Sequence, residues 1–424
     1  MCRTDRWGAS VSLSRREAVQ FGGAGLLVAG LGLPVSAGGT ARDDLRQLLD
    51  GAVAEGAVPG LVALVGRGGE VWTHVAGLRD LDSGVLMTRD TVFAAASIGK
   101  PITAVSALML VEDGGMGLDD PVDPWLPELA DRRVLRHLDG PLDDTVPAER
   151  AITLRDLLSM RMGLGAIFAD PASTPIAARM QELGVAPGPQ LFGGDADDFM
   201  ARLGALPLAY QPGERWLYHT GLDVAGVLVA RASGMPLGVF QQERIFAPLG
   251  MTDTGFHGPA DRLATTYWRN PATGEFEVWN AASGASFADP PPFEAGGGGH
   301  VATVDDFHAF GRFLLDGGVA GGRRLLSAEL VAEMLTDQIT AEQKAASPWF
   351  PADFWDSHGW GLGVALRTDP PARGRFGWWG GFGTAFWCDP ETDTVAALFT
   401  QRMMSGADDT ALPEAFLAAA FGMA

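Results

Sequence analysis

Lysine and cysteine are both scarce in this chain of 424 residues. Only two of its 31 basic residues are lysines, Lys100 and Lys344, so arginine supplies the positive charge almost everywhere else. Two cysteines occur, Cys2 and Cys388, and two thiols are too few for a cysteine-based zinc site. Because Cys2 lies in a segment that we expect to be removed, the mature protein should have no internal disulfide.

The chain also lacks an excess of positive charge and any apolar run of bilayer length. Its formal net charge is −21, which argues against nucleic acid, since phosphate neutralisation needs clustered lysine and arginine. Apolar residues make up 47% of the chain, enough to build a core and too many for a disordered protein. We expect a globular protein with a small-molecule substrate and no stable membrane span in its mature form; the oligomeric state stays open.

Residues 1–37 resemble an export signal. The paired arginines of Ser14-Arg15-Arg16 precede the apolar run Phe21–Leu33, and Val35-Ser36-Ala37 offers small residues for cleavage. The pair resembles a twin-arginine signal, although Ala18 stands where that motif usually carries a large apolar residue. We therefore expect export to the periplasm or beyond the cell, and an uncleaved N-terminal anchor is the alternative.

Both ends of the chain carry the pattern of short strands. Two apolar runs flank Gly68-Gly69, a pair that is typical of a hairpin turn. Three more runs lie near the C-terminus, and a segment with helical spacing of apolar residues lies at each end. The expected strands are Leu61–Val65, Val71–Val75, Arg375–Trp379, Thr384–Cys388 and Thr394–Thr400, and the expected helices are Asp43–Glu55 and Pro413–Phe421.

The middle of the chain predicts helices that are separated by long loops rich in proline and glycine. The simplest architecture is an α/β (α+β) fold: an antiparallel sheet flanked by helices, built from both chain ends (41–93 and 300–424). A mainly helical subdomain, 94–299, is inserted between them, and the whole forms one catalytic domain. The loops Ala166–Gly194 and Gly258–Pro292 are candidates for the wall of a binding cleft. The expected helices here are Ile102–Glu112, Leu154–Ser159, Asp223–Ala232 and Phe240–Leu249.

Ser97 and Lys100 form the first candidate catalytic motif, a Ser-x-x-Lys at the start of an apolar helix. Residues three apart share a helix face, so the Lys100 amine can lie beside the Ser97 hydroxyl. A serine hydroxyl needs a neighbour that takes its proton, which a desolvated lysine can do and an arginine cannot. The alternative is a helix-capping serine beside a solvated lysine.

Tyr218 and a glycine motif complete the candidate set. Tyr218 lies at a junction between a turn and the helix expected from Asp223, a suitable place for a catalytic phenol. The alternative is a buried tyrosine with a structural hydrogen bond. In the segment Trp378–Thr384, Gly380 and Gly381 would let a ligand approach the backbone closely, as an oxyanion hole requires. A tight turn between strands is the alternative there.

Together, the order and spacing of these elements resemble the serine beta-lactamase-like superfamily, in the branch of class C beta-lactamases, D-alanyl-D-alanine peptidases and related esterases. The resemblance runs from about Asp43 to the C-terminus. Further stretches that look familial are Ile152–Leu158, Pro212-Gly213, Pro248–Met251, Gly296–Gly299, Thr303–Asp306 and Gly361–Gly363.

The resemblance implies a serine hydrolase that acts through an acyl-enzyme. Ser97 would attack the substrate carbonyl, and Lys100 and Tyr218 would share its proton, with Tyr218 as the base and as the acid for the leaving group. The backbone N–H groups of Ser97 and Phe382 would hold the oxyanion, and water would release the acyl group. No cofactor is implied.

Two departures from the family pattern change the expected substrate. Trp379 stands where beta-lactamases and peptidases carry a Lys or His that helps to hold a substrate carboxylate, and Thr220 stands where class C enzymes often have Asn. An indole offers bulk and one N–H but no charge, so we expect a carboxylesterase acting on uncharged acyl esters. The residues expected to bind substrate are Trp216, Thr220, Trp360, Trp379, Gly380 and Gly381, with Phe382 also in the acyl pocket.

Other classes of protein stay open. A beta-lactamase or D-alanyl-D-alanine carboxypeptidase is the first alternative, and a non-catalytic ligand-binding member of the fold is the second. The chain has no Gly-x-Ser-x-Gly, which argues against an α/β-hydrolase. No metal site is expected, because His300 and His308 lie near two aspartates without a His-Glu-x-x-His helix. His219 is expected in a pocket wall; the alternative is that it tunes the adjacent Tyr218.

Overall fold

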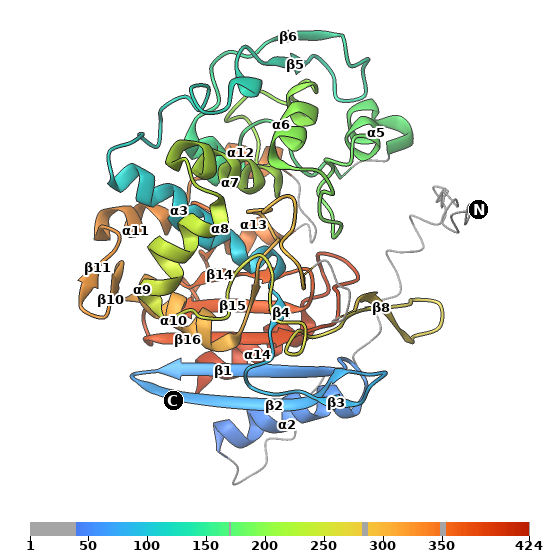
Figure 1. Cartoon of the computed structure of the whole chain (residues 1–424), viewed down its shortest axis with the longest axis vertical. Helices are drawn as coiled ribbons and strands as arrows, with labels where there is room; N and C mark the ends of the chain where they lie inside the picture. The colour runs from blue at the N-terminus through green and yellow to red at the C-terminus, as the bar shows by residue number, and fades with distance from the viewer. Residues whose placement is uncertain (1–39, 169–170, 282–286, 348–352, 424) are drawn as a thin grey trace.

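The centre of the fold is one eight-stranded sheet that joins the two ends of the chain (Figure 1). The computed structural model describes residues 40–168, 171–281, 287–347 and 353–423. The expected export signal, residues 1–37, lies outside the described residues. In order across the sheet, the strands are β12 (His358–Trp360), β13 (Ala365–Arg367), β14 (Phe376–Gly380), β15 (Thr384–Asp389), β16 (Thr394–Thr400), β1 (Gly60–Arg67), β2 (Glu70–Asp80) and β3 (Val85–Leu86).

All neighbouring strands of this sheet are antiparallel. Strands β1 and β2 form the hairpin that the sequence predicts, with Arg67 opposite Glu70. Gly68 and Gly69 both have positive φ, 56° and 85°, as a two-residue hairpin turn requires. The C-terminal strand β16 then pairs with the N-terminal β1, so the sheet closes only when both ends of the chain are present (Figure 1).

Helices cover the sheet at its centre. Helices α2 (Ala41–Ala54) and α14 (Ala411–Gly422) pack against each other and against the sheet, and α10 (Val304–Leu315) packs on strands β1, β15 and β16. Every residue of β16 is buried, so both faces of the sheet are covered here. The predicted fold, an antiparallel sheet flanked by helices and built from both chain ends, is confirmed.

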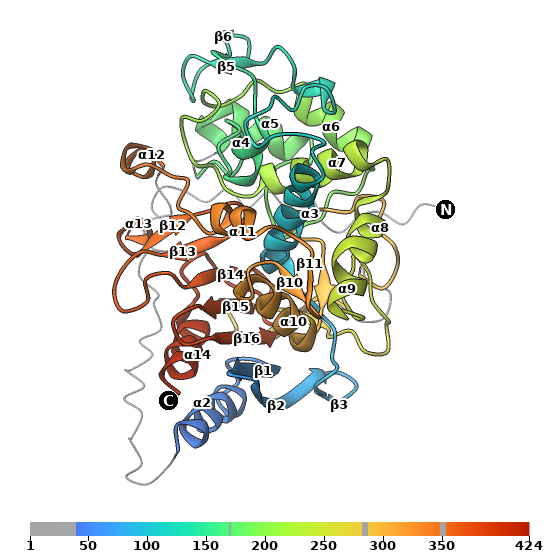
Figure 2. The same cartoon turned by 90° about the vertical axis from the view of Figure 1, so that its left-hand side faces the viewer.

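A mainly helical region packs at one end of the sheet (Figure 2). Its central helix is α3 (Lys100–Glu112), in which every residue from Lys100 to Leu110 is buried. Such a helix is apolar on all sides because it lies inside the protein rather than on its surface. The other helices in the described part of the chain are α4 (Leu154–Leu158), α5 (Pro175–Glu182), α6 (Ala196–Gly204), α7 (Thr220–Ser233), α8 (Leu237–Gln241), α9 (Ala247–Leu249), α11 (Ala328–Met334), α12 (Ala341–Ala346) and α13 (Phe354–Ser357).

Several short elements complete the chain. A π-helical turn, Gln242–Phe246, joins α8 to α9, so the helix expected at Phe240–Leu249 begins at Leu237 and is not regular. Short 3-10 turns lie at Ala96–Gly99, Pro127–Leu129 and Pro171–Ser173. The small strand pairs are β4 (Phe93–Ala94) with β9 (Val301–Ala302), β5 (Arg133–Leu135) with β6 (Thr145–Pro147), β7 (Thr266–Arg269) with β8 (Phe276–Asn280), and β10 (Val319–Ala320) with β11 (Arg323–Arg324).

The two expected loops contain structure that their weak periodicity did not indicate. The segment Ala166–Gly194 includes α5, and Gly258–Pro292 includes the β7–β8 hairpin. The division of the chain at 93/94 and 299/300 stays a prediction.

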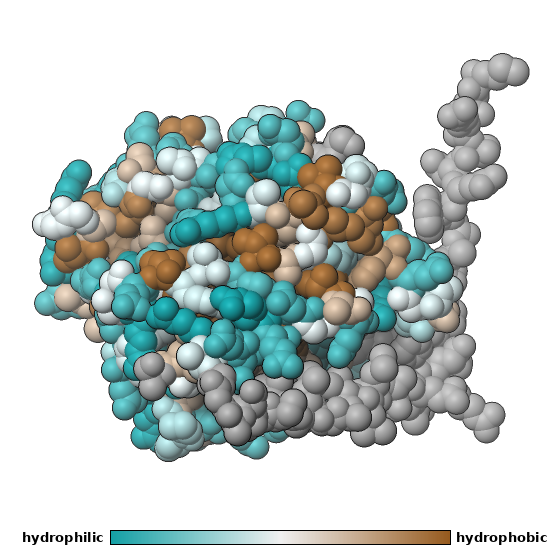
Figure 3. Space-filling view, turned by 90° about the horizontal axis from the view of Figure 1, so that it is seen from below, coloured by the Kyte–Doolittle hydropathy of each residue, from teal (hydrophilic) through white to brown (hydrophobic). Residues whose placement is uncertain are grey.

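No single helix among the described residues is long and apolar enough to cross a membrane; one bent pair, Thr220–Ser233 with Leu237–Leu249, passes that test by length and composition only. On the face shown in Figure 3, small apolar patches in brown alternate with hydrophilic groups in teal.

The sheet meets the Ser-x-x-Lys motif at Gly380. Strand β14 packs on the 3-10 turn Ala96–Gly99, which contains Ser97. Thr384 Oγ1 donates a hydrogen bond of 2.8 Å to the carbonyl of Ala95, so β15 also holds the residues before the serine. A Cβ added at Gly380 would overlap both Thr384 Oγ1 and the Ala95 carbonyl. Only glycine therefore permits this approach of strand and turn.

Two adjacent glycines allow a matched test of that contact. We expect Gly380→Ala to destabilise the protein by about 1–3 kcal/mol, because backbone and Thr384 must move to accept the methyl group. Gly381→Ala should leave the melting temperature close to that of the wild type, because an added Cβ there meets nothing within 4 Å. Thermal unfolding of both variants checks this, and equal melting temperatures would contradict it.

Candidate active site

Ser97 lies on a constrained turn between strand β4 and helix α3. Residue Ala96, directly before it, has φ 52°, a left-handed conformation that few non-glycine residues adopt. The N–H of Ala95 donates to the carbonyl of His300 at 2.8 Å, which ties the turn to β9. Backbone strain of this kind is often found where a side chain must be presented for function.

Lys100 is the first residue of α3, and its side chain is completely buried. Its Nζ lies 2.8 Å from Ser97 Oγ and also donates to the carbonyl of Gly297. Burial lowers the pKa of Lys100 to about 7, although the carboxylate of Asp223 acts in the opposite direction. The spacing-based prediction that the amine lies beside the serine hydroxyl is thus met, and near neutral pH this amine can accept a proton.

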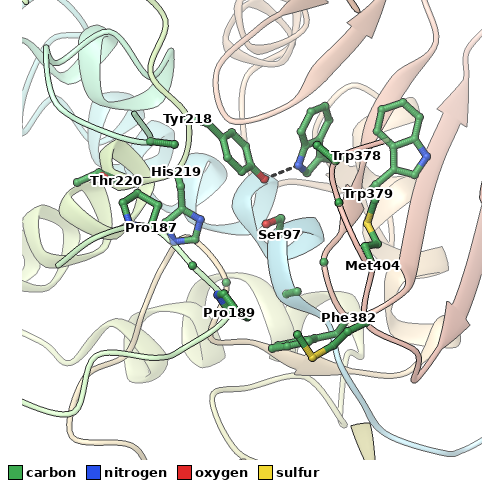
Figure 4. Close-up of a pocket in the computed structure, with 18 of the residues that line it drawn as sticks. Ser97, Pro187, Pro189, Tyr218, His219, Thr220, Trp378, Trp379, Phe382 and Met404 are labelled. Carbon is green, nitrogen blue, oxygen red and sulfur yellow. Dashed lines mark hydrogen bonds between the residues drawn. The ribbon is translucent and has the colours of Figure 1, made fainter. Parts of the chain in front are cut away.

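Tyr218 lies beside Ser97 (Figure 4). Its hydroxyl accepts a hydrogen bond of 2.6 Å from the indole N–H of Trp378, and its ring centroid lies 4.6 Å from Lys100 Nζ. Burial raises the pKa of Tyr218 above its usual value, although hydrogen bonds with Ser97 and Trp378 oppose this rise. The phenol is therefore neutral at rest.

These two pKa directions separate the roles of the two groups. The family resemblance gives Tyr218 as the base, but a phenol with a raised pKa holds its proton, whereas Lys100 releases its proton near pH 7. A base works best when its pKa lies near the working pH, which favours Lys100 as the group that accepts the Ser97 proton. Tyr218 is better suited to donate a proton.

A cavity of about 750 Å³ opens onto Ser97. The segments before and after helix α5 form one wall, with Ala166, Phe168 and the stretch 184–192. Phe382, Met403 and Met404 form another part of the wall, and Figure 4 shows Ser97 between Phe382 and the pair Tyr218–Trp378. The first of the two loops that we expected in the wall of a cleft does line the cavity, whereas none of the described residues of the second, 258–281 and 287–292, does.

Four of the expected pocket residues line this cavity: Thr220, Trp379, Gly381 and Phe382. Trp379 Nε1 is buried and has no hydrogen-bond partner. Gly380 lies behind the cavity wall against Ala95. Phe382 belongs to the turn between β14 and β15, next to the Ser97 turn, and its role as an oxyanion donor stays a prediction.

Trp216 and Trp360 do not lie in the pocket wall, where we expected them. They are 2% and 0% exposed and do not line the cavity. Their rings pack behind Tyr218 and Trp378: the Trp216–Tyr218 centroids are 5.6 Å apart and the Trp360–Trp378 centroids 4.8 Å. The prediction that these two rings contact the acyl group is therefore wrong. They fill the space behind Tyr218 and so hold the phenol in position.

Sequence reasoning missed the roles of Trp378 and Asp223. Trp378 holds the Tyr218 hydroxyl, and its signal was its place in the Gly motif directly before Trp379. His219 lines the cavity, as expected, and it also contacts both Lys100 and Asp223, which the sequence did not indicate. His300 Nε2 lies 2.9 Å from Gln241 Oε1. Within the described part of the chain, no group of three or more His, Cys, Asp or Glu could hold a metal ion.

The sheet, the Ser97–Lys100 pair and Tyr218 define a protein of the serine beta-lactamase fold. The family model described as Beta-lactamase matches residues 45–420, so the chain belongs to the beta-lactamase family. Members of this family that it resembles are hydrolases and acyltransferases.

Similar proteins cover most of the chain. Protein Rv1367c of Mycobacterium tuberculosis (strain ATCC 25618 / H37Rv) is 38% identical over 369 residues, which are 84% of this chain and 88% of that protein. Esterase EstB of Burkholderia gladioli is 36% identical over 225 residues, 53% of this chain and 54% of that protein. The structure of EstCE1, described as a hydrolase with promiscuous acyltransferase activity, has a TM-score of 0.75 and 25% identity, and the match covers 90% of this chain and 98% of EstCE1.

The Trp378 hydrogen bond to Tyr218 can be tested by a matched pair of variants. Trp378→Phe removes the only N–H of that side chain, and we expect ester hydrolysis to fall about tenfold, the effect of losing roughly 1.4 kcal/mol. Trp387→Phe removes an indole N–H that has no partner, so its activity should stay within about twofold of the wild type. Steady-state kinetics on one ester would contradict this assignment if both variants lost activity equally.

Proposed function

We propose that this protein is a serine carboxylesterase that acts on uncharged acyl esters through an acyl-enzyme on Ser97. The observation that carries the proposal is the charge of the cavity wall. Its one arginine among the described lining residues, Arg367, is held by Asp369 through two hydrogen bonds of 2.8 Å. The wall also contains four carboxyl groups, from Asp223, Asp353, Asp408 and Glu414.

Such a wall repels a substrate that carries a carboxylate, because like charges at short range oppose binding. Trp379 adds to this, since it brings an uncharged ring to the cavity. Apolar side chains dominate the remaining lining, which suits an acyl group without charge. These apolar side chains include Phe168, Leu191, Phe192, Phe293, Phe382 and Met403.

The proposed reaction uses the two proton carriers in turn. Lys100 accepts the proton of Ser97 as Oγ attacks the acyl carbon, and the carbonyl oxygen becomes an oxyanion held by backbone N–H groups. Tyr218 then gives its proton to the leaving alcohol and regains one from Lys100, so no proton is gained or lost overall. Water attacks the acyl-enzyme by the same route in reverse.

A comparison of two substrate classes tests the proposal. We expect p-nitrophenyl esters of uncharged acids to be hydrolysed with kcat/KM at least about a hundredfold above that for nitrocefin, a loss of about 2.7 kcal/mol for the anionic substrate. The reverse preference would support the beta-lactamase alternative.

The control for that comparison is Ser97→Ala, which should lose at least about a thousandfold in ester hydrolysis. A fluorophosphonate probe should label the wild type at Ser97 and leave the variant unlabelled. Absence of any adduct on the wild type would instead favour the non-catalytic, ligand-binding alternative.

Acyl transfer to an alcohol is the second activity that the site supports, because the acyl-enzyme can react with an alcohol in place of water. The likeness to EstCE1 favours it. We expect the ester of an added primary alcohol to appear beside the free acid when both products are separated by chromatography. Free acid alone, at molar concentrations of the alcohol, would contradict this.

A further inference from the structure

His219 occupies a strained turn directly beside the candidate catalytic groups. Its φ and ψ are 83° and −64°, and the N–H of Thr220 donates to the carbonyl of Tyr218 at 3.3 Å. These are the features of a γ-turn with positive φ, which is rare and strained for a residue with a side chain. The turn directs the Tyr218 ring and the His219 ring into the site together (Figure 4). A strained residue of this kind persists only where the surrounding contacts hold it in place, which is often at a functional site.

The contacts of His219 connect Lys100 with a buried carboxylate. Its Nδ1 lies 3.2 Å from Lys100 Nζ, and its Nε2 lies 3.0 Å from Asp223 Oδ2. The other oxygen of Asp223, Oδ1, accepts the N–H of Gly297 at 2.7 Å. A carboxylate cannot donate, so Nε2 carries the hydrogen and Nδ1 presents its lone pair to the lysine.

This arrangement keeps the carboxylate from pairing directly with the lysine. Both oxygens of Asp223 are engaged, one by His219 and one by Gly297. The acceptors around Lys100 Nζ are consequently all uncharged: Ser97 Oγ, His219 Nδ1 and the carbonyl of Gly297. A buried lysine next to a carboxylate would be held as an ammonium ion, which cannot take a proton from serine.

We propose that His219, with its tautomer fixed by Asp223, is a positioning residue that turns the Lys100 amine toward Ser97 and separates it from the Asp223 carboxylate. The inference rests on the proposed role of Lys100 in activating Ser97. Two neighbouring features fit it. Burial and the Lys100 charge both lower the pKa of His219, which keeps the ring neutral. Gly297 has no side chain, and an added Cβ would lie 2.8 Å from Asp223 Oδ1 and 3.1 Å from His219 Nε2.

The groups that face Lys100 come from several elements. Tyr218 and His219 come from the turn before α7, and Asp223 from α7 itself. His300 precedes β9. Burial lowers the pKa of His300 to about 3 and the charge of Lys100 acts in the same direction, so the ring stays neutral. Asp223 is thus the one anion among these groups, and the two substitutions at positions 219 and 223 should act on Lys100 in opposite directions.

The scarcity of lysine makes a direct measurement possible. With 13C-labelled lysine, the protein should give two side-chain Cε signals, from Lys100 and Lys344. We expect His219→Ala to raise the titration midpoint of Lys100 by about one pH unit, because water enters and the Asp223 charge is no longer separated from the amine. Asp223→Asn should lower it, because the only anion is lost. Lys344, which pairs with Asp337 at 2.6 Å, should not change in any variant.

A second readout is the rate at which a fluorophosphonate probe labels Ser97 as a function of pH. The acid limb of that profile should shift to higher pH in His219→Ala and to lower pH in Asp223→Asn. His219→Asn places an amide oxygen near the position of Nδ1 and tolerates positive φ, so it should be labelled faster than His219→Ala. The surface pair His74–Asp50, 2.7 Å apart, provides the matched control, and His74→Ala should leave the profile unchanged.

The outcomes separate this inference from the proposed function. Midpoints that move in the same direction in both variants, or that stay at the wild-type value in folded protein, would overturn the role of His219. Should His219→Ala not fold, the comparison of His219→Asn with the near-isosteric Asp223→Asn decides the question. The NMR measurement needs no substrate, so it stands even when ester hydrolysis fails, whereas a wild type that no probe labels overturns the role of Lys100 in activating Ser97 and this inference with it.

Discussion

The burial of one amine, that of Lys100, is the constraint on which the rest of the structure depends. An ammonium ion is costly to remove from water, so a buried lysine is stable only where its neighbours accept its hydrogens or where it loses its charge. Helix α3 places this amine in the centre of the protein, and Ser97, His219 and Gly297 surround it with acceptors. The arginine-rich composition acquires a physical meaning here, since arginine could fill the same space but could not release a proton.

The groups around that amine come from both structural regions. The helical region supplies Lys100 and Tyr218, and the sheet supplies Trp378, which fixes the phenol. Strand β14 comes close to the serine turn only because Gly380 has no side chain. The large rings of Trp216 and Trp360 then fill the space behind Tyr218. Positioning in this site is therefore done mostly by aromatic packing and by close backbone contacts.

The sequence predicts those parts of the fold and site that local patterns determine. Short apolar runs and turn residues predict the hairpin at Gly68-Gly69 and the C-terminal strands, and helical spacing predicts the contact between Ser97 and Lys100. The hydrogen bond between Trp378 and Tyr218 joins residues 160 positions apart, and the contact between His219 and Lys100 joins residues 119 apart. No local pattern specifies such pairs. Trp216 and Trp360 were misplaced for the same reason, because composition cannot tell a ring that lines a cavity from one that supports its wall.

The pairing of β16 with β1 has a consequence for the timing of reactivity. Ser97 is made early, but the strands that carry Trp378 and close the sheet belong to the last 50 residues of the chain. An incomplete chain has the serine and the lysine without Trp378, whose indole N–H holds the Tyr218 hydroxyl. The complete arrangement of these groups is thus a property of the folded sheet, and it forms only after the C-terminal strands have been synthesised.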